Sequence, residues 1–294
     1  MIGQPAQTPL PIVSINGELT PGDGPAISPR DRGFTLADGL FETMRVTGGV
    51  VFRLDRHLAR LSGGLGVMQI PQPARLREWV LHAVSHAGIA DGSVRLTVTR
   101  GPGRGGLPPP DDVQPTTAIA VGPRPGVHAD TYRQGLRTIL SSGRRNPRSL
   151  SAGLKTLSYT DAVLAWLEAQ RAGADEALLL DTDGHCSEAT ASNLFVWHRG
   201  TLLTPPTTCA ALPGITREAV LELAASLSIP AQERAFGPED LAAADEVFLT
   251  SSLRGLAPVR SLDARPVGAG TVGNVTARLS AAYDALVSRE CGTA

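Results

Sequence analysis

Lysine is almost missing from this sequence. Of its 27 basic residues all but Lys155 are arginine, although lysine is normally among the commoner residues. A compositional bias toward arginine accounts for much of this imbalance. Arginine, however, stays protonated at any working pH, whereas lysine can be tuned to a neutral amine that forms a Schiff base. Lys155 is therefore the first candidate for a functional amine.

Other absences exclude whole classes of function. The three cysteines form no CxxC pair and the six histidines form no spaced ligand set, so we expect neither a disulfide framework nor a metal site. A net charge of −1, with the basic residues spread along the chain, gives no field that would attract nucleic acid or a membrane. No signal segment is evident, and no apolar run approaches the roughly 18 residues of a membrane span. We expect a cytoplasmic protein whose partner is a small molecule.

The length and composition favour two folded domains. The chain has 294 residues, which is longer than one typical domain. Of these residues 42% are hydrophobic and 19% charged, as is usual for a folded globular protein. Residues 122–130 are rich in proline and glycine and follow an apolar strand, which is typical of a linker. We therefore expect a small α/β domain over residues 1–121, a linker over 122–130 and a larger domain over 131–294.

The hydrophobic pattern predicts a mixed α/β fold. In the first part we expect a strand over residues 12–19, a hairpin around Gly48-Gly49 and a strand over 93–100, with helices at 57–68 and 74–88. In the second part Lys155 precedes an amphipathic helix. Strands follow at 175–182, 193–205 and 246–252, and a helix opens at LPGITREA.

Several polar residues could bind an anion. The Pro-Gly pair before the helix at LPGITREA would direct the backbone N–H groups of Ile215 and Thr216, and the Thr216 hydroxyl, toward one point at a positive helix end. Ser251 and Ser252 add hydroxyls after a strand, and Arg60 could make a bidentate contact with a phosphate. Taken alone, the helix start is also compatible with an ordinary Pro-Gly turn, and an ordinary turn or surface role explains the serines and Arg60 better than anion binding does.

Glu188 lies between two apolar strands, where a carboxylate is costly unless it is paired. A protonated pyridine nitrogen would be a suitable partner, and a carboxylate in that place keeps the ring an electron sink. A capping or surface role would also explain a single glutamate. Together with Lys155 and the anion site, however, Glu188 completes the three parts that a pyridoxal 5'-phosphate (PLP) site requires.

The chain resembles the class IV aminotransferases of PLP fold type IV, which include branched-chain aminotransferases, D-amino-acid aminotransferases and aminodeoxychorismate lyases. The resemblance covers nearly the whole length, with family motifs in order: DRGFTLADGLFETMRV, FRLDRHLARL, LKTLSY, SEATASNLF, LPGITREA and DEVFLTSSLRGLAPV. It implies a small α/β domain, a larger barrel-like α/β domain and a homodimer with shared active sites. It also implies roles for individual residues: Lys155 as the Schiff-base lysine and proton shuttle, Glu188 at the pyridine nitrogen, Tyr159 beside the phenolic oxygen, and Arg60, Ile215, Thr216, Ser251 and Ser252 at the phosphate.

The motifs leave the particular reaction open. The loop TRGPGRGGLPPP and the run SSLRG resemble the lyases most, and Phe41, Arg95 and Arg104 would then meet a dicarboxylate substrate. Ser251, however, stands where many lyases have asparagine. The Arg-x-His carboxylate trap of D-amino-acid enzymes is incomplete, because glycines follow Arg104. The FEG and GTA motifs of branched-chain enzymes are replaced by FET and SSL. We therefore expect an aminodeoxychorismate lyase first, a D-amino-acid or (R)-amine aminotransferase second, and a branched-chain aminotransferase third.

Overall fold

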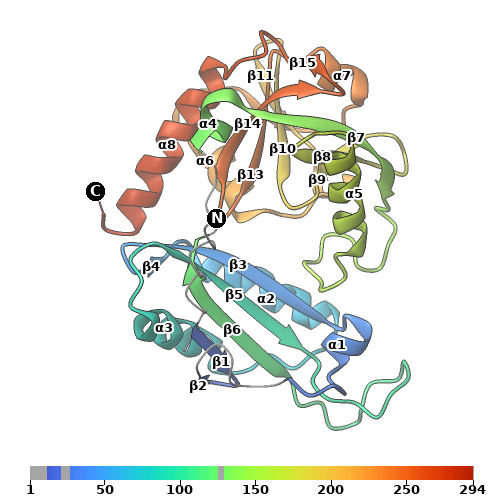
Figure 1. Cartoon of the computed structure of the whole chain (residues 1–294), viewed down its shortest axis with the longest axis vertical. Helices are drawn as coiled ribbons and strands as arrows, with labels where there is room; N and C mark the ends of the chain where they lie inside the picture. The colour runs from blue at the N-terminus through green and yellow to red at the C-terminus, as the bar shows by residue number, and fades with distance from the viewer. Residues whose placement is uncertain (1–11, 21–26, 125–128, 294) are drawn as a thin grey trace, which may run out of the picture. The chain divides into compact units, whose positions relative to one another are not determined.

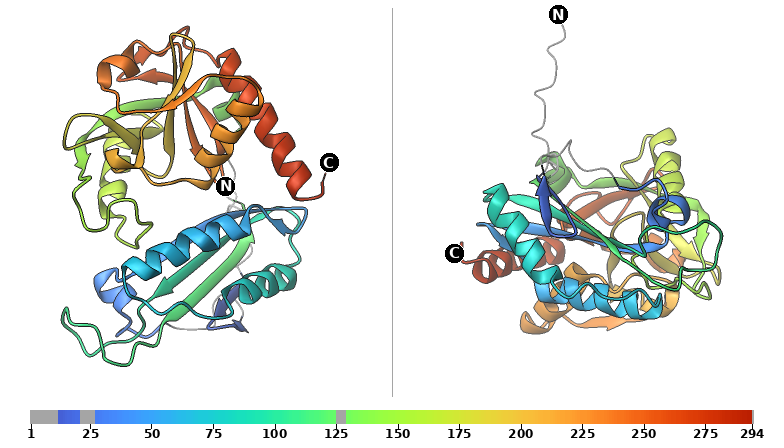
Figure 2. Two further views of the ribbon diagram at one scale, coloured as in Figure 1. Left: turned by 180° about the vertical axis from the view of Figure 1, so that it is seen from behind. Right: turned by 90° about the horizontal axis from the view of Figure 1, so that it is seen from below.

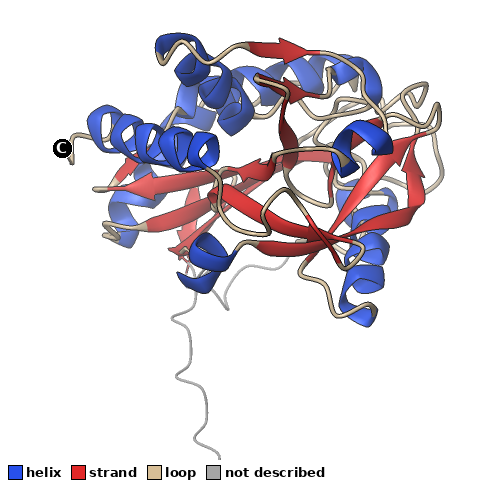
Figure 3. Cartoon of the chain, turned by 90° about the horizontal axis from the view of Figure 1, so that it is seen from above, coloured by secondary structure: helices blue, strands red, loops and turns tan. Residues whose placement is uncertain are grey.

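The computed structural model describes residues 12–20, 27–124 and 129–293. The chain forms two compact units, each of which combines helices and strands (Figures 1 and 3). Unit 1 comprises Met1–Pro125, Lys155–Leu157 and Val287–Ala294, and unit 2 comprises Gly126–Leu154 and Ser158–Leu286. Of the predicted linker, residues 125–128 lie outside the described residues, while strand β6 continues to Pro123 and helix α4 begins at Ala129.

Unit 1 is built on a six-stranded antiparallel sheet with the order β2-β1-β6-β5-β3-β4. Helix α2 packs on β3, and α3 packs on β6 and β1, so both helices cover the same face of the sheet (Figure 2). The bounds are β1 Ile12–Ile15, β2 Glu18–Thr20, α1 Arg32–Leu36, β3 Gly39–Thr47, β4 Val50–Val51, α2 Leu54–Val67, α3 Leu76–Ala87, β5 Gly92–Thr99 and β6 Thr116–Pro123.

The two faces of this sheet differ in chemistry because side chains alternate along each strand. The face under the helices is fully buried, and its centre consists of Met44, Val94, Leu96 and Ile119, each with no exposed surface. The opposite face carries smaller and polar side chains, such as Thr43 and Thr97. Two of the predicted substrate residues also lie on this opposite face.

Unit 2 is built on a nine-stranded mixed sheet with the order β12-β11-β10-β13-β14-β7-β8-β9, and β15 pairs with β14. An additional pairing of Glu188 in β9 with Asn193 in β10 closes six of these strands into a barrel-like ring. The strands are β7 Leu136–Arg145, β8 Glu176–Asp181, β9 Cys186–Ala189, β10 Asn193–His198, β11 Thr201–Thr204, β12 Ala231–Glu233, β13 Glu246–Ser251, β14 Gly255–Leu262 and β15 Arg265–Pro266. The helices are α4 Ala129–Gln134, α5 Thr160–Arg171, the 3-10 helix η1 Thr207–Cys209, α6 Ile215–Ser226, α7 Pro238–Ala242 and α8 Asn274–Glu290.

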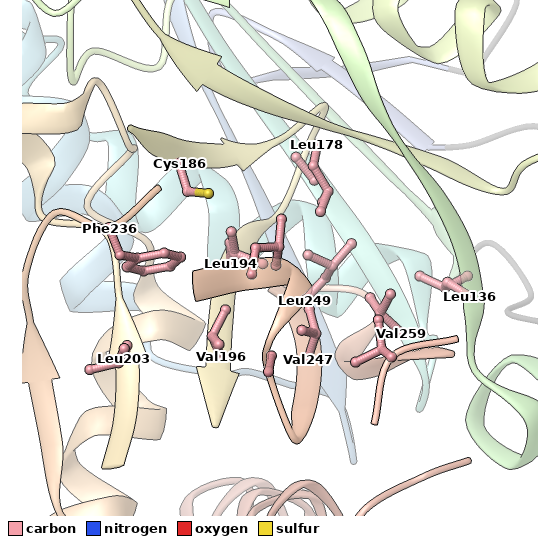
Figure 4. Close-up of a cluster of buried hydrophobic side chains, with 14 of the residues drawn as sticks. Leu136, Leu178, Cys186, Leu194, Val196, Leu203, Phe236, Val247, Leu249 and Val259 are labelled. Atoms are coloured by element: carbon pink, nitrogen blue, oxygen red, sulfur yellow. The ribbon is translucent and has the colours of Figure 1, made fainter. Parts of the chain in front are cut away.

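Apolar side chains from most of these strands fill the centre of unit 2. Leu178, Leu194, Val247, Leu249 and Val259 are at most 3% exposed and point into one cluster (Figure 4). A second cluster under α5 consists largely of alanines, including Ala165, Ala169 and Ala177, whose small side chains let the helix lie close to β7 and β8. The mixed α/β class is thereby confirmed.

Two of the predicted strands were wrong in detail, because each contains a turn. Residues 12–19 form the hairpin β1–β2, in which Asn16 and Gly17 adopt φ angles of 52° and 90°. Residues 193–205 form the hairpin β10–β11 around Arg199 and Gly200, with φ angles of 48° and 78°. Positive φ at both central residues is the tight-hairpin geometry that glycine and asparagine favour. The helices at 57–68 and 74–88 and the hairpin at Gly48-Gly49 are confirmed.

None of the helices in the described part of the chain is long and apolar enough to cross a membrane.

Candidate active site

Lys155 lies on a short segment that pairs with the start of β3. The Phe41 amide donates to the Lys155 carbonyl and the Leu157 amide donates to the Gly39 carbonyl, each at 3.0 Å. These bonds align residues 155–157 antiparallel to β3 and make them part of unit 1. The Lys155 Nζ atom lies 4.2 Å from the centre of the Phe41 ring. Main-chain pairing therefore fixes the position of this lysine.

Arg95 lies against the same aromatic ring. Phe41 pairs with Thr97, so Arg95 is its diagonal neighbour on the same face of the sheet. The guanidinium carbon of Arg95 lies 3.3 Å from the Phe41 ring centre, a cation–π contact. Phe41, Arg95 and Lys155, which were predicted separately from the sequence, thus form one cluster.

On the other face of β3, Glu42 anchors a buried ion cluster. Its carboxylate accepts two bonds from Arg60, at 2.7 and 2.6 Å, and lies 2.7 Å from His57 Nδ1. Glu42 and His57 are at most 1% exposed. Burial alone would raise the pKa of Glu42, but hydrogen bonds from His57 and Arg60 outweigh it and lower the pKa overall. Burial lowers the pKa of His57, so a neutral ring donates its Nδ1–H to Glu42.

Arg104 lies exposed on the loop between β5 and β6. Arg32 fastens this loop, since its guanidinium donates to the carbonyls of Gly106 and Leu107 and pairs with Asp38. Arg100 pairs with the same carboxylate. Burial tends to raise the pKa of Asp38, but the two arginines lower it overall. The predicted substrate residue Arg104 is thus carried by an anchored loop that continues from β5.

In unit 2, Glu188 lies where the barrel closes. It is 7% exposed, and its Oε2 atom accepts from Asn193 Nδ2 at 3.1 Å and from the Leu212 amide at 2.9 Å. Arg145 pairs with Oε1 at 3.0 Å. These donors fix the orientation of the carboxylate.

Ile215 and Thr216 begin helix α6, with Gly214 as the N-cap. The first intrahelical bond runs from the Glu218 amide to the Gly214 carbonyl, so the amides of Ile215, Thr216 and Arg217 keep the free donor capacity of a helix start. A Cβ atom at Gly214 would lie 1.9 Å from the Asn193 Oδ1 atom. Only glycine therefore lets this helix start approach the side chain that holds Glu188.

Ser251 ends strand β13, Ser252 begins the turn that follows, and Arg254 stabilises this serine turn. The Arg254 amide donates to the Ser251 hydroxyl, and the Arg254 guanidinium pairs with Glu176 Oε2 at 3.0 Å. Glu176 is 1% exposed and also accepts from the Thr190 hydroxyl. The buried Glu176 carboxylate thus connects the serine turn to Thr190, which directly follows β9, the strand that contains Glu188.

The candidate residues therefore fall in two sets. Unit 1 contains Phe41, Arg60, Arg95, Arg104 and Lys155, and unit 2 contains Tyr159, at the start of α5, with Glu188, Ile215, Thr216, Ser251 and Ser252. Sequence reasoning missed the residues that hold these sets in place. They are Glu42, His57, Arg145, Glu176, Asn193 and Arg254.

Comparisons with known proteins show the family and the fold of this chain. Residues 39–262 match the family described as "Amino-transferase class IV". A putative branched-chain-amino-acid aminotransferase from Methanocaldococcus jannaschii is 35% identical over 91% of this chain and 93% of its own length. The solved 4-amino-4-deoxychorismate lyase from Pseudomonas aeruginosa is 36% identical, with a TM-score of 0.83 over 92% of this chain and 97% of that one. A branched-chain amino acid aminotransferase from T.th., solved with pyridoxamine 5'-phosphate, is 28% identical, with a TM-score of 0.90 over 98% and 96%.

The chain belongs to the class IV aminotransferase family. Its fold is that of the fold type IV enzymes, and it is a PLP-dependent enzyme, as the sequence predicts. The bound cofactor supplies an electron sink for the carbon that carries the substrate amine.

The residues of unit 2 fit this cofactor. Glu188 is a buried, oriented carboxylate suited to a protonated ring nitrogen. The N-terminus of α6, which Gly214 leaves open, offers backbone amides suited to a phosphate. These features support the roles assigned to Glu188, Ile215 and Thr216, which remain predictions.

Proposed function

We propose that this enzyme is an aminodeoxychorismate lyase, which releases 4-aminobenzoate and pyruvate from aminodeoxychorismate. The observation that carries the proposal is the cluster of Arg95 and Lys155 on the Phe41 ring. The substrate has two carboxylates besides its amine, and a guanidinium beside the reactive lysine would bind one of them through two parallel bonds. The 36% identity to the lyase from Pseudomonas aeruginosa supports the same assignment.

Lys155 would act as the base of this reaction. With PLP bound, the Lys155 amine would remove the hydrogen from the substrate carbon that carries the nitrogen. Loss of this proton would let the carbon–oxygen bond at the neighbouring carbon break, so that the ring becomes aromatic and enolpyruvate leaves with the electron pair. Enolpyruvate would then take up a proton to give pyruvate. The backbone amides at the start of α6 would bind the phosphate throughout.

A branched-chain aminotransferase is the second candidate. It is favoured by the relative from Methanocaldococcus jannaschii, which is 35% identical over 91% of this chain. The two activities differ in the step after proton removal, because a transaminase returns the proton to the cofactor and a lyase expels the β-substituent. A D-amino-acid or (R)-amine aminotransferase would share the transaminase outcome with a donor of opposite configuration.

The deciding experiment gives the purified holoenzyme three substrates in parallel. They are aminodeoxychorismate, L-leucine with 2-oxoglutarate, and D-alanine with the same acceptor. We expect pyruvate and 4-aminobenzoate in equal amounts from the first. Absence of pyruvate from the reaction with aminodeoxychorismate would refute the lyase. If only L-leucine or D-alanine reacts, each in the presence of 2-oxoglutarate, formation of the corresponding oxo acid would assign a transaminase.

The Arg95→Met variant tests the observation behind the proposal. Loss of a charge-assisted carboxylate contact of about 1.5–3 kcal/mol should raise the KM for aminodeoxychorismate roughly 10- to 100-fold, with a smaller effect on kcat. Arg77→Met is the matched control, because Arg77 is an exposed residue on α3 that pairs with Asp55. Equal KM values for the two variants would remove Arg95 from the substrate site.

We also propose that the enzyme is a homodimer with shared active sites, as its family resemblance implies. Helix α5 supports this with the exposed apolar side chains of Val163, Leu164 and Trp166, which are 53%, 57% and 40% exposed. Light scattering on the protein as it elutes from a size-exclusion column should give twice the 30.7 kDa mass of one chain. A fully active monomer would contradict the proposal.

A further inference from the structure

Three potential metal ligands lie together at one end of the barrel of unit 2. Asp181 ends strand β8, His185 precedes strand β9, and Cys209 ends the 3-10 helix η1. One ligand atom of each residue lies within 4.8 Å of the other two. The Asp181 and Cys209 side chains are buried, and the His185 side chain is 44% exposed. The cluster is therefore preassembled and open to solvent on one side.

Backbone hydrogen bonds hold the carboxylate of this cluster in a definite orientation. Asp181 Oδ1 accepts from the amides of Asp183 and His185, both at 2.9 Å. The Asp181 amide donates to the His185 carbonyl at 2.7 Å and closes the turn. These bonds turn the other oxygen, Oδ2, toward His185 Nδ1, which lies 3.5 Å away.

The same bonds leave Oδ2 with weak partners among the described side chains. The histidine nitrogen is at 3.5 Å, beyond a good hydrogen bond. The remaining neighbour is the Cys209 thiol, a weak donor. A buried carboxylate is costly unless it is well paired, so this oxygen is well placed for a cation.

We propose that Asp181 Oδ2, His185 Nδ1 and Cys209 Sγ bind a zinc ion, with water as the fourth ligand. Zinc accepts this combination of carboxylate, imidazole and thiolate in tetrahedral geometry, whereas magnesium and calcium prefer oxygen ligands alone. Bonds of about 2.0–2.3 Å place the ligand atoms of such a site roughly 3.3–3.8 Å apart. The three ligand atoms, which lie within 4.8 Å of one another, would close to these spacings by rotation of the His185 and Cys209 side chains. Zinc replaces the thiol proton, which passes to water.

The sequence did not reveal this site because the ligands come from two separate segments. Asp181 and His185 share the turn between β8 and β9, whereas Cys209 follows three further strands, β9, β10 and β11. From Cys209 the chain runs to Ala210, whose carbonyl accepts from Arg145, and to Leu212, whose amide holds Glu188. A bound zinc would therefore also fix the segment that orients the carboxylate for the cofactor.

The test measures zinc on the PLP-loaded enzyme after removal of metals with a chelating resin and dialysis against zinc. Metal content is determined by mass spectrometry, and the ligands by X-ray absorption. The variants are Cys209→Ser and His185→Gln, the second of which alters an exposed side chain and should fold normally. Cys291→Ser and His86→Gln are the matched controls, because Cys291 is buried in unit 1 and His86 is exposed on α3.

We expect about one zinc per chain in the wild type and both controls, with a single sulfur ligand at about 2.3 Å. Both site variants should bind zinc at least roughly tenfold more weakly. The proposal is overturned if the wild type binds no zinc, if its zinc has no sulfur ligand, or if His185→Gln and Cys209→Ser bind as tightly as the controls.

Discussion

Replacing Glu42 with glutamine should strongly destabilise the protein. Glu42 has no exposed surface, and its carboxylate accepts two bonds from Arg60 and one from His57. Removing one charge of a buried pair costs about 3–5 kcal/mol, because the Arg60 guanidinium then faces a neutral amide in place of the carboxylate. At about 2–4 °C per kcal/mol, the melting temperature should fall by roughly 6–20 °C.

Thermal unfolding of the cofactor-free protein, followed by circular dichroism, measures this directly. The matched control is Glu78→Gln, which makes the same exchange in an exposed ion pair with Arg75 on α3. Exposed pairs contribute little, so the control should melt like the wild type. If Glu42→Gln also melts within about 2 °C of the wild type, the buried cluster does not stabilise unit 1 and our interpretation of it is wrong.

Three further predictions concern pH, the serine turn and the helix start. Burial keeps the pKa of His57 below 6.5, so the unfolded chain binds more protons below that pH. The free energy of unfolding should therefore fall as the pH drops from 7.5 to 5.5. In denaturant titrations His57→Gln should reduce this dependence of the unfolding free energy on pH. An equal dependence in the variant and the wild type would show that other groups cause it. Glu176→Gln removes the ion pair of Arg254 and should weaken PLP binding roughly tenfold in fluorescence titrations, whereas unchanged affinity would separate this carboxylate from the cofactor site. Gly214→Ala places a carbon 1.9 Å from the Asn193 amide oxygen, should cost about 1–3 kcal/mol of stability and should shift the absorbance of the bound cofactor; a variant that melts like the wild type would refute this clash.

The sequence is most informative where chemistry limits the choice of residue. Lys155 is conspicuous because arginine occupies every other basic position. The helix start at Ile215 follows from the Pro-Gly pair before it. The turns at Asn16-Gly17 and Arg199-Gly200 were missed because apolar residues on both sides resemble one continuous strand.

Partners that are distant in the sequence were not predictable in this way. Glu42 occupies the buried face of β3 among Leu40, Met44 and Val46, and a charged residue in that alternating pattern signals a buried partner. The pattern does not say that Arg60 is that partner. Likewise, no local signal pairs residues 155–157 with β3, because this contact depends on how the chain folds back over more than a hundred residues.

The closure of the barrel is a similar case. It depends on the pairing of Glu188 with Asn193, two residues separated by a short turn that could also continue as a loop. The carboxylate gains its orientation from Asn193 and from the Leu212 amide, which comes from a later segment. The need for a carboxylate at position 188 could therefore be predicted from the sequence, whereas its orientation by Asn193 and the Leu212 amide could not.

We predict that Lys155 holds the cofactor through an imine, and reduction of the holoenzyme with borohydride can establish this bond. The reagent fixes an imine between lysine and PLP, and peptide mass spectrometry then locates the adduct. We predict a pyridoxyl adduct on the peptide containing Lys155 in the wild type, and none in Lys155→Ala refolded with excess PLP. A wild-type enzyme that carries PLP without an adduct at Lys155 would contradict the account.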